Sequence, residues 1–256
     1  MGETPPVPFD LPADRLAGRV ALVTGASRGL GASMAARFAE RGLKLALCAR
    51  AVPDLPAGSV GIAASVDVAD AAALEGFAAA AEAELGPIAL WVSNAGVLEP
   101  MGPLRDADPG AIERALLVNV GGVANGSRIF ARLARAAAGH RRVLVNVSSG
   151  AARSVYEGWA TYGATKAAVD HLTEIVAAEE PDLVCHAVAP GVVDTDMQAL
   201  IRTHDAASFP AIERFRELHR TDSWNDPAWI ADHLLGLLAA TWRPDEIVVR
   251  VPDVPR

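Results

Sequence analysis

The sequence predicts an α/β protein: a single-domain, Rossmann-like, doubly wound sheet of about seven parallel strands with helices on both faces. Two observations lead to this fold class. Short apolar runs alternate along the chain with longer Ala-rich stretches of helical periodicity, which is the pattern of βαβ units. The length of 256 residues, with 51% hydrophobic and 21% charged residues, suits one domain with a substantial core.

Strands are predicted where apolar runs have no polar face, because parallel strands are covered on both sides. They cover Val20–Thr24, Leu43–Ala49, Val60–Val66, Ile88–Ser93, Val143–Ser148, Leu183–Val188 and Glu246–Val251. The predicted helices, several opened by an Asp, a Thr or an early Pro, cover Leu30–Glu40, Ala71–Leu85, Pro109–Ala138, Ala160–Ala178 and Pro227–Ala240. The Pro-containing stretch after Arg50 leaves little room for a helix, so we expect a truncated second crossover.

Two segments depart from the alternating pattern. Residues 1–17 hold four prolines before Ala13 and show no periodicity, so we expect a flexible N-terminal arm preceding one folded domain at residues 18–256. Residues 197–224 have weak periodicity and several charges, which indicates an insertion with short helices. This insertion is either a substrate lid or an ordinary mobile loop.

Charge and composition narrow the function classes. A formal net charge of -8 argues against nucleic acid or an anionic membrane as partner, since either would be met by clustered Lys and Arg. No apolar stretch is long enough to span a bilayer, and no targeting signal opens the chain. Cys48 and Cys185 lie in apolar runs and are expected to be buried thiols in a reducing compartment. We therefore expect a cytoplasmic protein that acts on a small molecule.

A glycine-rich turn follows the first predicted strand and opens the first predicted helix. It carries Gly25, Gly29 and Gly31 in the segment Thr24-Gly-Ala-Ser-Arg-Gly-Leu-Gly31. Glycines at such a turn let backbone amides approach a pyrophosphate at the helix N-terminus. The same glycines could serve close packing alone, so the turn by itself indicates a dinucleotide site without proving one.

Tyr162 and Lys166 lie four residues apart in a predicted helix and therefore on one face. An ammonium beside a phenol favours the phenolate, so we expect Lys166 to lower the pKa of Tyr162. The same spacing also suits a core tyrosine with a solvated lysine. Ser149 ends the fifth predicted strand, at the sheet edge where open α/β folds bind ligands.

Several motifs together resemble the short-chain dehydrogenase/reductase family over nearly the whole chain. They are the Gly-x-x-x-Gly-x-Gly turn, Asp67-Val68, Asn94-Ala-Gly96, Tyr162-Gly-Ala-Thr-Lys166 and Pro190-Gly-Val-Val-Asp-Thr195. The thirteen-residue interval from Ser149 to Tyr162 also matches the family. Ser93 departs from the more usual Asn.

The resemblance implies a carbonyl reductase that uses NADP(H). Tyr162 would donate the proton, Lys166 would tune it and Ser149 would polarise the carbonyl, while Asn119 beside a helix distortion would hold a water that links Lys166 to solvent. A mid-helix Asn could instead be a satisfied polar residue. The residues implied in cofactor binding are Gly25, Ser27, Arg28, Gly29, Leu30, Gly31, Arg50, Asp67, Val68, Asn94, Ala95, Gly96, Tyr162, Lys166, Pro190, Gly191, Val193 and Thr195.

Two arginines decide the expected cofactor. Arg50 ends the second predicted strand, where NAD-preferring relatives carry an acid, and Arg28 lies in the glycine-rich turn. Guanidinium groups bind a 2′-phosphate through charge-assisted hydrogen bonds, so NADP is favoured over NAD. Each arginine alone could be a solvated surface charge.

The residues that flank the catalytic ones are expected to line the substrate pocket: Leu98, Glu99, Met101, Tyr156, Trp159 and Met197. The segment Val97-Leu-Glu-Pro resembles the branch of sepiapterin and benzil reductases, which implies a 1,2-dicarbonyl or a pterin side-chain ketone as substrate. The alternatives are a generic ketoreductase, such as a 3-oxoacyl thioester reductase, and a catalytically silent NADPH-binding regulator. No metal is expected, since the six histidines are scattered, and the long Ala- and Leu-rich helices favour a homodimer or homotetramer.

Overall fold

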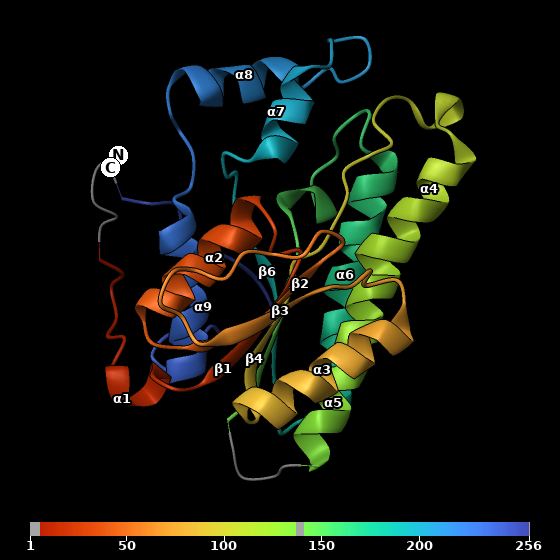
Figure 1. Cartoon of the computed structure of the whole chain (residues 1–256). Coiled ribbons are helices and arrows are strands. Elements are labelled where there is room, and N and C mark those ends of the chain that lie inside the picture. Colours follow the sequence, from red (N-terminus) through yellow and green to blue (C-terminus); the bar gives the residue numbers. More distant parts are fainter. Residues whose placement is uncertain (1–5, 137–140, 256) are drawn as a thin grey trace.

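A computed structural model describes residues 6–136 and 141–255 and shows one seven-stranded sheet between layers of helices (Figure 1). Its strands are β1 (Val20–Thr24), β2 (Lys44–Ala49), β3 (Gly61–Ser65), β4 (Ile88–Ser93), β5 (Val143–Val147), β6 (Val184–Ala189) and β7 (Val248–Arg250). They lie in the order β3-β2-β1-β4-β5-β6-β7, and every neighbouring pair is parallel. The predicted fold class is confirmed, with strand ends displaced by at most two residues.

The strand order reverses between β1 and β4. From β1 the chain builds outward through β2 to β3, and from β4 it builds the other way to β7. In open α/β sheets the carboxyl ends of the strands at such a switch point form the ligand-binding crevice. The glycine-rich turn after β1 and the Asn-Ala-Gly segment after β4 therefore meet at this crevice.

Helices cover both faces of the sheet (Figure 1). The helices that build these layers are α2 (Gly29–Glu40), α3 (Ala71–Leu85), α4 (Pro109–Leu116), α5 (Gly122–Ala136), α6 (Ala160–Glu179) and α9 (Pro227–Ala239). In β1, Ala21 and Val23 point into the core beneath α2 and α9, whereas Val20 and Leu22 point into the core beneath α3 and α5. Alternation along fully buried strands thus divides the hydrophobic core into two halves.

The structure corrects the single helix predicted over Pro109–Ala138. α4 passes into the π-helical turn η2 (Leu117–Gly121), and α5 begins at Gly122. A Cβ on Gly122 would lie 2.5 Å from Val68 Cγ2, so this glycine allows the helix to approach Val68. Ala137 and Ala138 lie outside the described residues. Residues 50–60 form no helix, which agrees with the expected truncated crossover.

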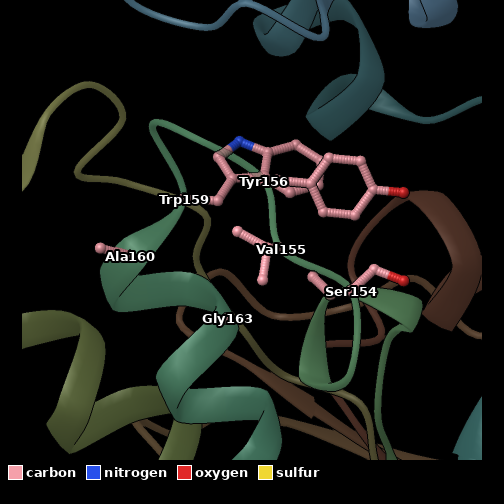
Figure 2. A pocket seen from close by; sticks show the side chains of 7 residues that line it. Ser154, Val155, Tyr156, Trp159, Ala160 and Gly163 are labelled. Atoms are coloured by element: carbon pink, nitrogen blue, oxygen red, sulfur yellow. The ribbon is translucent and has the colours of Figure 1, made fainter.

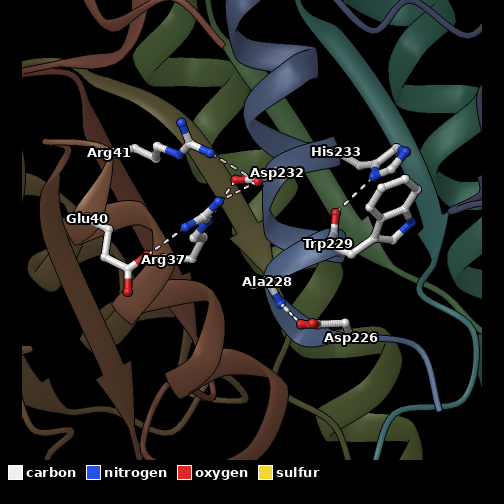
Figure 3. Close-up of polar contacts among 8 residues, drawn as sticks. All are labelled: Arg37, Glu40, Arg41, Asp226, Ala228, Trp229, Asp232 and His233. Atoms are coloured by element: carbon white, nitrogen blue, oxygen red, sulfur yellow. Dashed lines mark hydrogen bonds and ion pairs between the residues drawn. The ribbon is translucent and has the colours of Figure 1, made fainter. Parts of the chain in front are cut away.

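A buried carboxylate joins α2 to α9 (Figure 3). Asp232 on α9 accepts two hydrogen bonds from Arg37, at 2.9 and 2.7 Å, and one from Arg41 at 3.2 Å. The hydrogen bond with Asp232 raises the pKa of Arg37. Because a buried charge is tolerated when it is paired and hydrogen-bonded, this group fixes α2 against α9. The helix that begins at the glycine-rich turn is therefore held firmly.

Part of the expected N-terminal arm contacts α9. The helix α1 (Ala13–Leu16) follows a segment in which the Phe9 ring meets His233 edge-on, with centroids 5.2 Å apart. Arg15 Nη1 donates to the carbonyl oxygen of Ala239 at 2.9 Å. Residues 1–5 of the arm lie outside the described residues, and its flexibility stays a prediction.

The segment 197–224 forms two short helices that stand apart from the two layers, at one end of the sheet (Figure 1). They are α7 (Asp196–Arg202) and α8 (Ile212–Arg220). The short 3-10 helices η1 (Leu104–Asp106) and η3 (Gly150–Ala152) lie in the loops after β4 and β5. Within the described part of the chain, no helix combines the length and apolarity that crossing a bilayer requires.

Candidate active site

The structure brings Ser149, Tyr162 and Lys166 together at the carboxyl end of β5. Ser149 caps η3, and its Oγ accepts a hydrogen bond from the backbone N–H of Ala151 at 3.2 Å. Tyr162 lies in the first turn of α6, and its hydroxyl is hydrogen-bonded to that of Ser149. Lys166 is one turn further along, with Nζ 5.8 Å from the centroid of the Tyr162 ring.

Lys166 is buried and tied to the sheet. Its Nζ donates to the carbonyl oxygen of Val147, the last residue of β5, at 2.7 Å. Desolvation lowers the pKa of Lys166 to about 8, while the charge of Asp170 acts in the opposite direction. The ammonium is therefore held at a fixed position and can lose its proton at mildly alkaline pH.

The pKa of Tyr162 differs from the sequence-based expectation. Burial disfavours the phenolate and raises this pKa, and the hydrogen bond with Ser149 offsets the rise only in part. The net pKa of Tyr162 is therefore raised where the sequence predicted a lowered one, because the Tyr162 residue is only 8% exposed. A phenol of raised pKa stays protonated at neutral pH and is suited to donate a proton.

Asn119 lies in the π-helical turn and is fully buried. Its Oδ1 accepts from the N–H of Val97 at 2.8 Å, and its Nδ2 donates to the carbonyl of Val97 at 2.8 Å and to Thr165 Oγ1 at 3.1 Å. The amide thus ties the distorted helix both to the segment after β4 and to α6. Both of its polar atoms are engaged by protein groups.

Asp170 is a polar neighbour of the site that the sequence motifs did not single out. It lies on α6 one turn after Lys166 and is hydrogen-bonded to the hydroxyl of Ser148, the residue before Ser149. Arg153 Nε lies 3.9 Å from Asp170 Oδ2. Burial raises the pKa of Asp170, against the effects of Ser148 and Arg153. The i, i+4 spacing from Lys166 is the signal that could have revealed it.

The glycine-rich turn packs against the segment after β4. A Cβ on Gly25 would lie 2.7 Å from Ala95 Cα, and a Cβ on Gly31 would lie 2.3 Å from the carbonyl oxygen of Gly25. Asn94 Nδ2 donates to the carbonyl oxygens of Thr24 and Gly25, at 3.0 and 3.1 Å. Two of the predicted glycines are thus required by close backbone approach, and Asn94 fixes the turn.

The N-terminus of α2 differs from those of α3, α4 and α9. Those three helices are capped by the preceding residues Asp70, Asp108 and Asp226, whose side chains accept hydrogen bonds from first-turn N–H groups. At α2 the preceding residue, Arg28, provides no such bond. A helix start that has amide donors but no capping side chain suits an anion. The residues present therefore fit the pyrophosphate of a dinucleotide, with Ser27 exposed and Leu30 half-buried beside it.

The expected adenine and ribose residues lie on the β2–β3 side of the crevice. Asp67 accepts from the N–H of Ala69 at 3.0 Å and pairs with Arg114 at 2.7 Å. Burial raises the pKa of Asp67, but these hydrogen bonds outweigh it and the pKa is lowered. Val68 is buried, and Arg50 is exposed. Arg28 is exposed too, and its Nη1 pairs with Asp196 Oδ2 at 2.9 Å.

The turn after β6 is held by a residue that sequence reasoning missed. Asn225 Nδ2 donates to the carbonyl of Pro190 at 2.8 Å, and its backbone N–H donates to the carbonyl of Val192 at 2.7 Å. A Cβ on Gly191, which has φ of +81°, would lie 2.8 Å from Asn225 Nδ2. At the other end of this turn, Thr195 lies within 3.5 Å of a Cβ built on Gly29. Val193, which lies between Gly191 and Thr195 in sequence, is buried. No sequence motif marks Asn225.

Side chains from three segments form an aromatic cluster over Tyr162. We use this name for Leu98, Trp159, Tyr162, Ile201, Phe209, Ile212 and Phe215, with Met101, Tyr156 and Met197 packed against them. The Trp159 and Phe209 rings stack at 4.6 Å. All the predicted pocket residues except the exposed Glu99 thus gather here, while the two phenylalanines were missed. Beside the cluster lies a surface hollow of about 170 Å³ that Val155 and Tyr156 help to line (Figure 2).

A family model described as short chain dehydrogenase matches residues 19–206. The chain belongs to the short-chain dehydrogenase family. A benzil reductase, described as (S)-benzoin forming, from Bacillus subtilis is 31% identical over 228 residues, which cover 85% of this chain and 92% of that protein. This similarity places the chain in a benzil reductase-like branch of the short-chain dehydrogenases.

Two solved structures of short-chain dehydrogenases extend this comparison. One from Saccharomyces cerevisiae has a TM-score of 0.80 at 28% identity and covers 92% of this chain and 96% of that one. One from Burkholderia phymatum, in complex with NAD, has a TM-score of 0.75 at 26% identity and covers 93% and 90%. This short-chain dehydrogenase is therefore an oxidoreductase whose cofactor class is NAD(P)(H). Among residues 6–136 and 141–255, no group of three or more His, Cys, Asp and Glu side chains is arranged to hold a metal ion.

Proposed function

We propose that this protein reduces a ketone or aldehyde to an alcohol with NADPH, and that its substrate is a 1,2-dicarbonyl or a pterin side-chain ketone. One observation carries the proposal. The hydroxyls of Ser149 and Tyr162 are hydrogen-bonded to each other, beside the buried Lys166 and next to an uncapped helix that fits a dinucleotide.

The roles of the three side chains follow from their contacts. Ser149 Oγ accepts from the Ala151 N–H, which leaves its own proton to donate to a substrate carbonyl oxygen. Tyr162 is protonated at neutral pH, so it transfers a proton to the same oxygen. NADPH supplies the hydride when bound. Lys166 stabilises the phenolate that remains, from a position fixed by Val147.

Proton return to Tyr162 is assigned to the segment around Asn119. Because both amide atoms of Asn119 are engaged by protein groups, the backbone carbonyls of the π-helical turn, and not the side chain, would hold the water that links Lys166 to solvent. Asn119→Ala would then act by loosening this turn, and solvent isotope effects on kcat would rise in the variant.

The NADPH preference rests on Arg50 and Arg28. Both side chains are exposed near the expected ribose site, and neither position carries the acid that would repel a 2′-phosphate. Arg28 is paired with Asp196, so Arg50 would contribute more of the preference. A wild-type enzyme that turns over faster with NADH than with NADPH would overturn this part of the proposal.

Residues 197–224 act as a lid in this proposal. Phe209 and Phe215 contact Trp159, which packs on Tyr162. A Cβ on Gly158 would lie 2.3 Å from the carbonyl oxygen of Ser208, so the segment packs tightly on the loop before α6. In this proposal the contact opens to admit a substrate to Tyr162. Hydrogen exchange should show faster exchange at 197–224 than at α6, and equal protection in both would contradict a lid.

We further propose a cytoplasmic homodimer or homotetramer. Leu116, Leu117 and Ile175 are exposed large apolar residues on the α4–η2 and α6 surface. Burying them between copies would remove this apolar area from water. A monodisperse monomer at micromolar concentration in sizing with light scattering would contradict it.

The deciding experiment follows NADPH oxidation with benzil, other 1,2-diketones, sepiapterin, an acetoacetyl thioester and simple aldehydes, for the wild type and Tyr162→Phe. We expect turnover of a dicarbonyl, reduced in the variant by at least about 100-fold, the usual contribution of a positioned general acid. Preference for the thioester would instead identify a 3-oxoacyl thioester reductase. Tight NADPH binding without turnover of any substrate would identify a regulator.

A further inference from the structure

Trp159 has a polar atom that its surroundings leave unused. The residue is 6% exposed and lies at the centre of the aromatic cluster. Its rings stack on Phe209 and meet Tyr162 and Phe215 edge-on, with centroids 5.6 and 5.4 Å apart. Among the described residues, its Nε1 is buried and has no hydrogen-bond acceptor. A buried N–H without an acceptor is costly and therefore calls for an explanation.

The other two buried tryptophans, unlike Trp159, donate their indole N–H to an acceptor of the protein. Trp91 Nε1 donates to Ser93 Oγ at 3.2 Å, and Trp229 Nε1 donates to the carbonyl oxygen of Pro252 at 2.8 Å. Each of these indoles meets an acceptor that belongs to the protein. Trp159 is surrounded instead by aromatic rings and aliphatic side chains. The faces of aromatic rings are weak acceptors, and aliphatic side chains accept no hydrogen bond.

The position of Trp159 indicates where an acceptor would come from. The residue directly precedes α6 and lies three residues before Tyr162, so the two side chains share one side of the helix start. In Figure 2 the indole nitrogen faces away from Val155 and Ser154, which line the surface hollow. The N–H is thus directed away from these two residues, and it is buried.

We propose that Trp159 Nε1 donates a hydrogen bond to the second carbonyl oxygen of a vicinal dicarbonyl whose first carbonyl oxygen is held by Ser149 and Tyr162. This inference rests on the proposed function and makes Trp159 a specificity-determining residue. The first carbonyl carbon gains a hydride from NADPH, which is oxidised to NADP+, and its oxygen gains the Tyr162 proton. The second carbonyl is unchanged, so the product is an α-hydroxy ketone.

Two diaryl substrates isolate this hydrogen bond. Benzil has two adjacent carbonyls, whereas deoxybenzoin keeps both phenyl rings and has a single carbonyl. With the intact enzyme and NADPH, kcat/KM is measured for both substrates in the wild type and in Trp159→Phe. Loss of packing lowers both values, but only benzil also loses a hydrogen bond. We expect the benzil-to-deoxybenzoin ratio to fall about 10-fold in the variant, the usual effect of leaving one buried polar group unpaired.

A second variant removes the N–H with less change of shape. Replacing Trp159 by 3-benzothienylalanine keeps the bicyclic ring and substitutes sulfur for the N–H, and the ratio should fall by a similar factor. Phe215→Leu serves as the matched control, since it perturbs the same cluster without removing a donor and should leave the ratio within about twofold of the wild type. An equal loss for both substrates in the two Trp159 variants would overturn the inference. A wild type that reduces neither substrate, nor any other ketone, would instead reject the proposed function itself.

Discussion

The two halves of the crevice are built in different ways. On the cofactor side, backbone groups meet backbone groups: Gly31 packs on the carbonyl of Gly25, and Asn94 fixes the same turn through two carbonyl oxygens. On the substrate side, Trp159 and Phe209 meet as side chains from segments about fifty residues apart in sequence. Backbone contacts tolerate almost no substitution, whereas packed side chains tolerate changes that preserve volume. The cofactor half is thus constrained in sequence, and the substrate half is open to change.

The largest effect is expected from Gly31→Ala. The added Cβ would lie 2.3 Å from the carbonyl oxygen of Gly25 and 2.6 Å from Asn94 Nδ2, so the turn must move. Displacing a binding group by about 1 Å can reduce rate by about 100-fold, and we expect at least that loss in kcat/KM together with weaker NADPH binding by fluorescence titration. Gly76→Ala on α3, where nothing lies within 4 Å of the new Cβ, is the control. Similar losses in both variants would contradict the contrast between the two halves.

Arg50→Ser tests an exposed arginine of the cofactor half. Charge-assisted hydrogen bonds to a phosphate contribute about 1.5–3 kcal/mol each, so the ratio of kcat/KM for NADPH over NADH should fall by about 10-fold or more. Arg28→Ser should change this ratio less, because Arg28 is already paired with Asp196. Steady-state kinetics with both cofactors measure the two ratios. An unchanged ratio in Arg50→Ser would place the 2′-phosphate elsewhere.

Asp170→Asn tests the charge next to Lys166, between the cofactor half and the substrate half of the site. The pKa of Lys166 is about 8, lowered by burial, so kcat should fall as pH rises above 8 and the ammonium is lost. The Asp170 charge opposes that lowering, so removing it should move this alkaline limb toward lower pH by up to about one unit. The groups that face Asp170 are Lys166, Ser148, Arg153 and Glu174.

The control for Asp170 removes the same charge one turn further along α6. Glu174→Gln should leave the limb of the pH profile in place, because Glu174 is exposed and lies further from Lys166. A profile of kcat against pH that is identical in Asp170→Asn and the wild type would show that Asp170 only binds Ser148.

The smallest effect is expected from Phe209→Leu in the substrate half. A hydrophobic exchange of similar volume costs less than about 1.5 kcal/mol of unfolding free energy, because the cluster can repack. We expect KM for an aryl diketone to rise several-fold, since the stacked ring beside Trp159 is lost. Thermal unfolding and steady-state kinetics measure both. A loss as large as that of Gly31→Ala would show that the substrate half is as constrained as the cofactor half.

The periodicity and the capping residues of the sequence predicted the strands and most helices. The features that they did not predict depend on contacts between segments far apart in sequence. The helix Ala71–Leu85 is confirmed to the residue because Asp70 caps its start and Gly86 follows its end. Apolar periodicity did not predict the π-helical turn at Leu117–Gly121, since it does not report a local change in hydrogen bonding. A distortion beside Asn119 was expected from the family resemblance, and Gly121 and Gly122 suit it.

The residues of the candidate site likewise fall into those that the sequence predicted and those that depend on long-range packing. Ser149, Tyr162 and Lys166 could be named from the resemblance to the family, but the direction of the Tyr162 pKa could not. That direction follows from burial, which depends on packing between segments far apart in sequence. Asn225 was missed because its contacts to Pro190 and Val192 depend on how two remote loops meet.

The loop at residues 50–60, the truncated crossover, is a segment that could be replaced without disturbing the core. Residues 50–60 join β2 to β3 without a helix, and Val52 and Val60 in this stretch are 61% and 59% exposed. A loop that carries few buried contacts accepts insertions and replacements with little effect on the core. Since Arg50 opens this loop, replacing the loop by a helical connection from an NAD-using relative would test whether this segment sets the nucleotide preference, while the strands of the sheet stay unchanged.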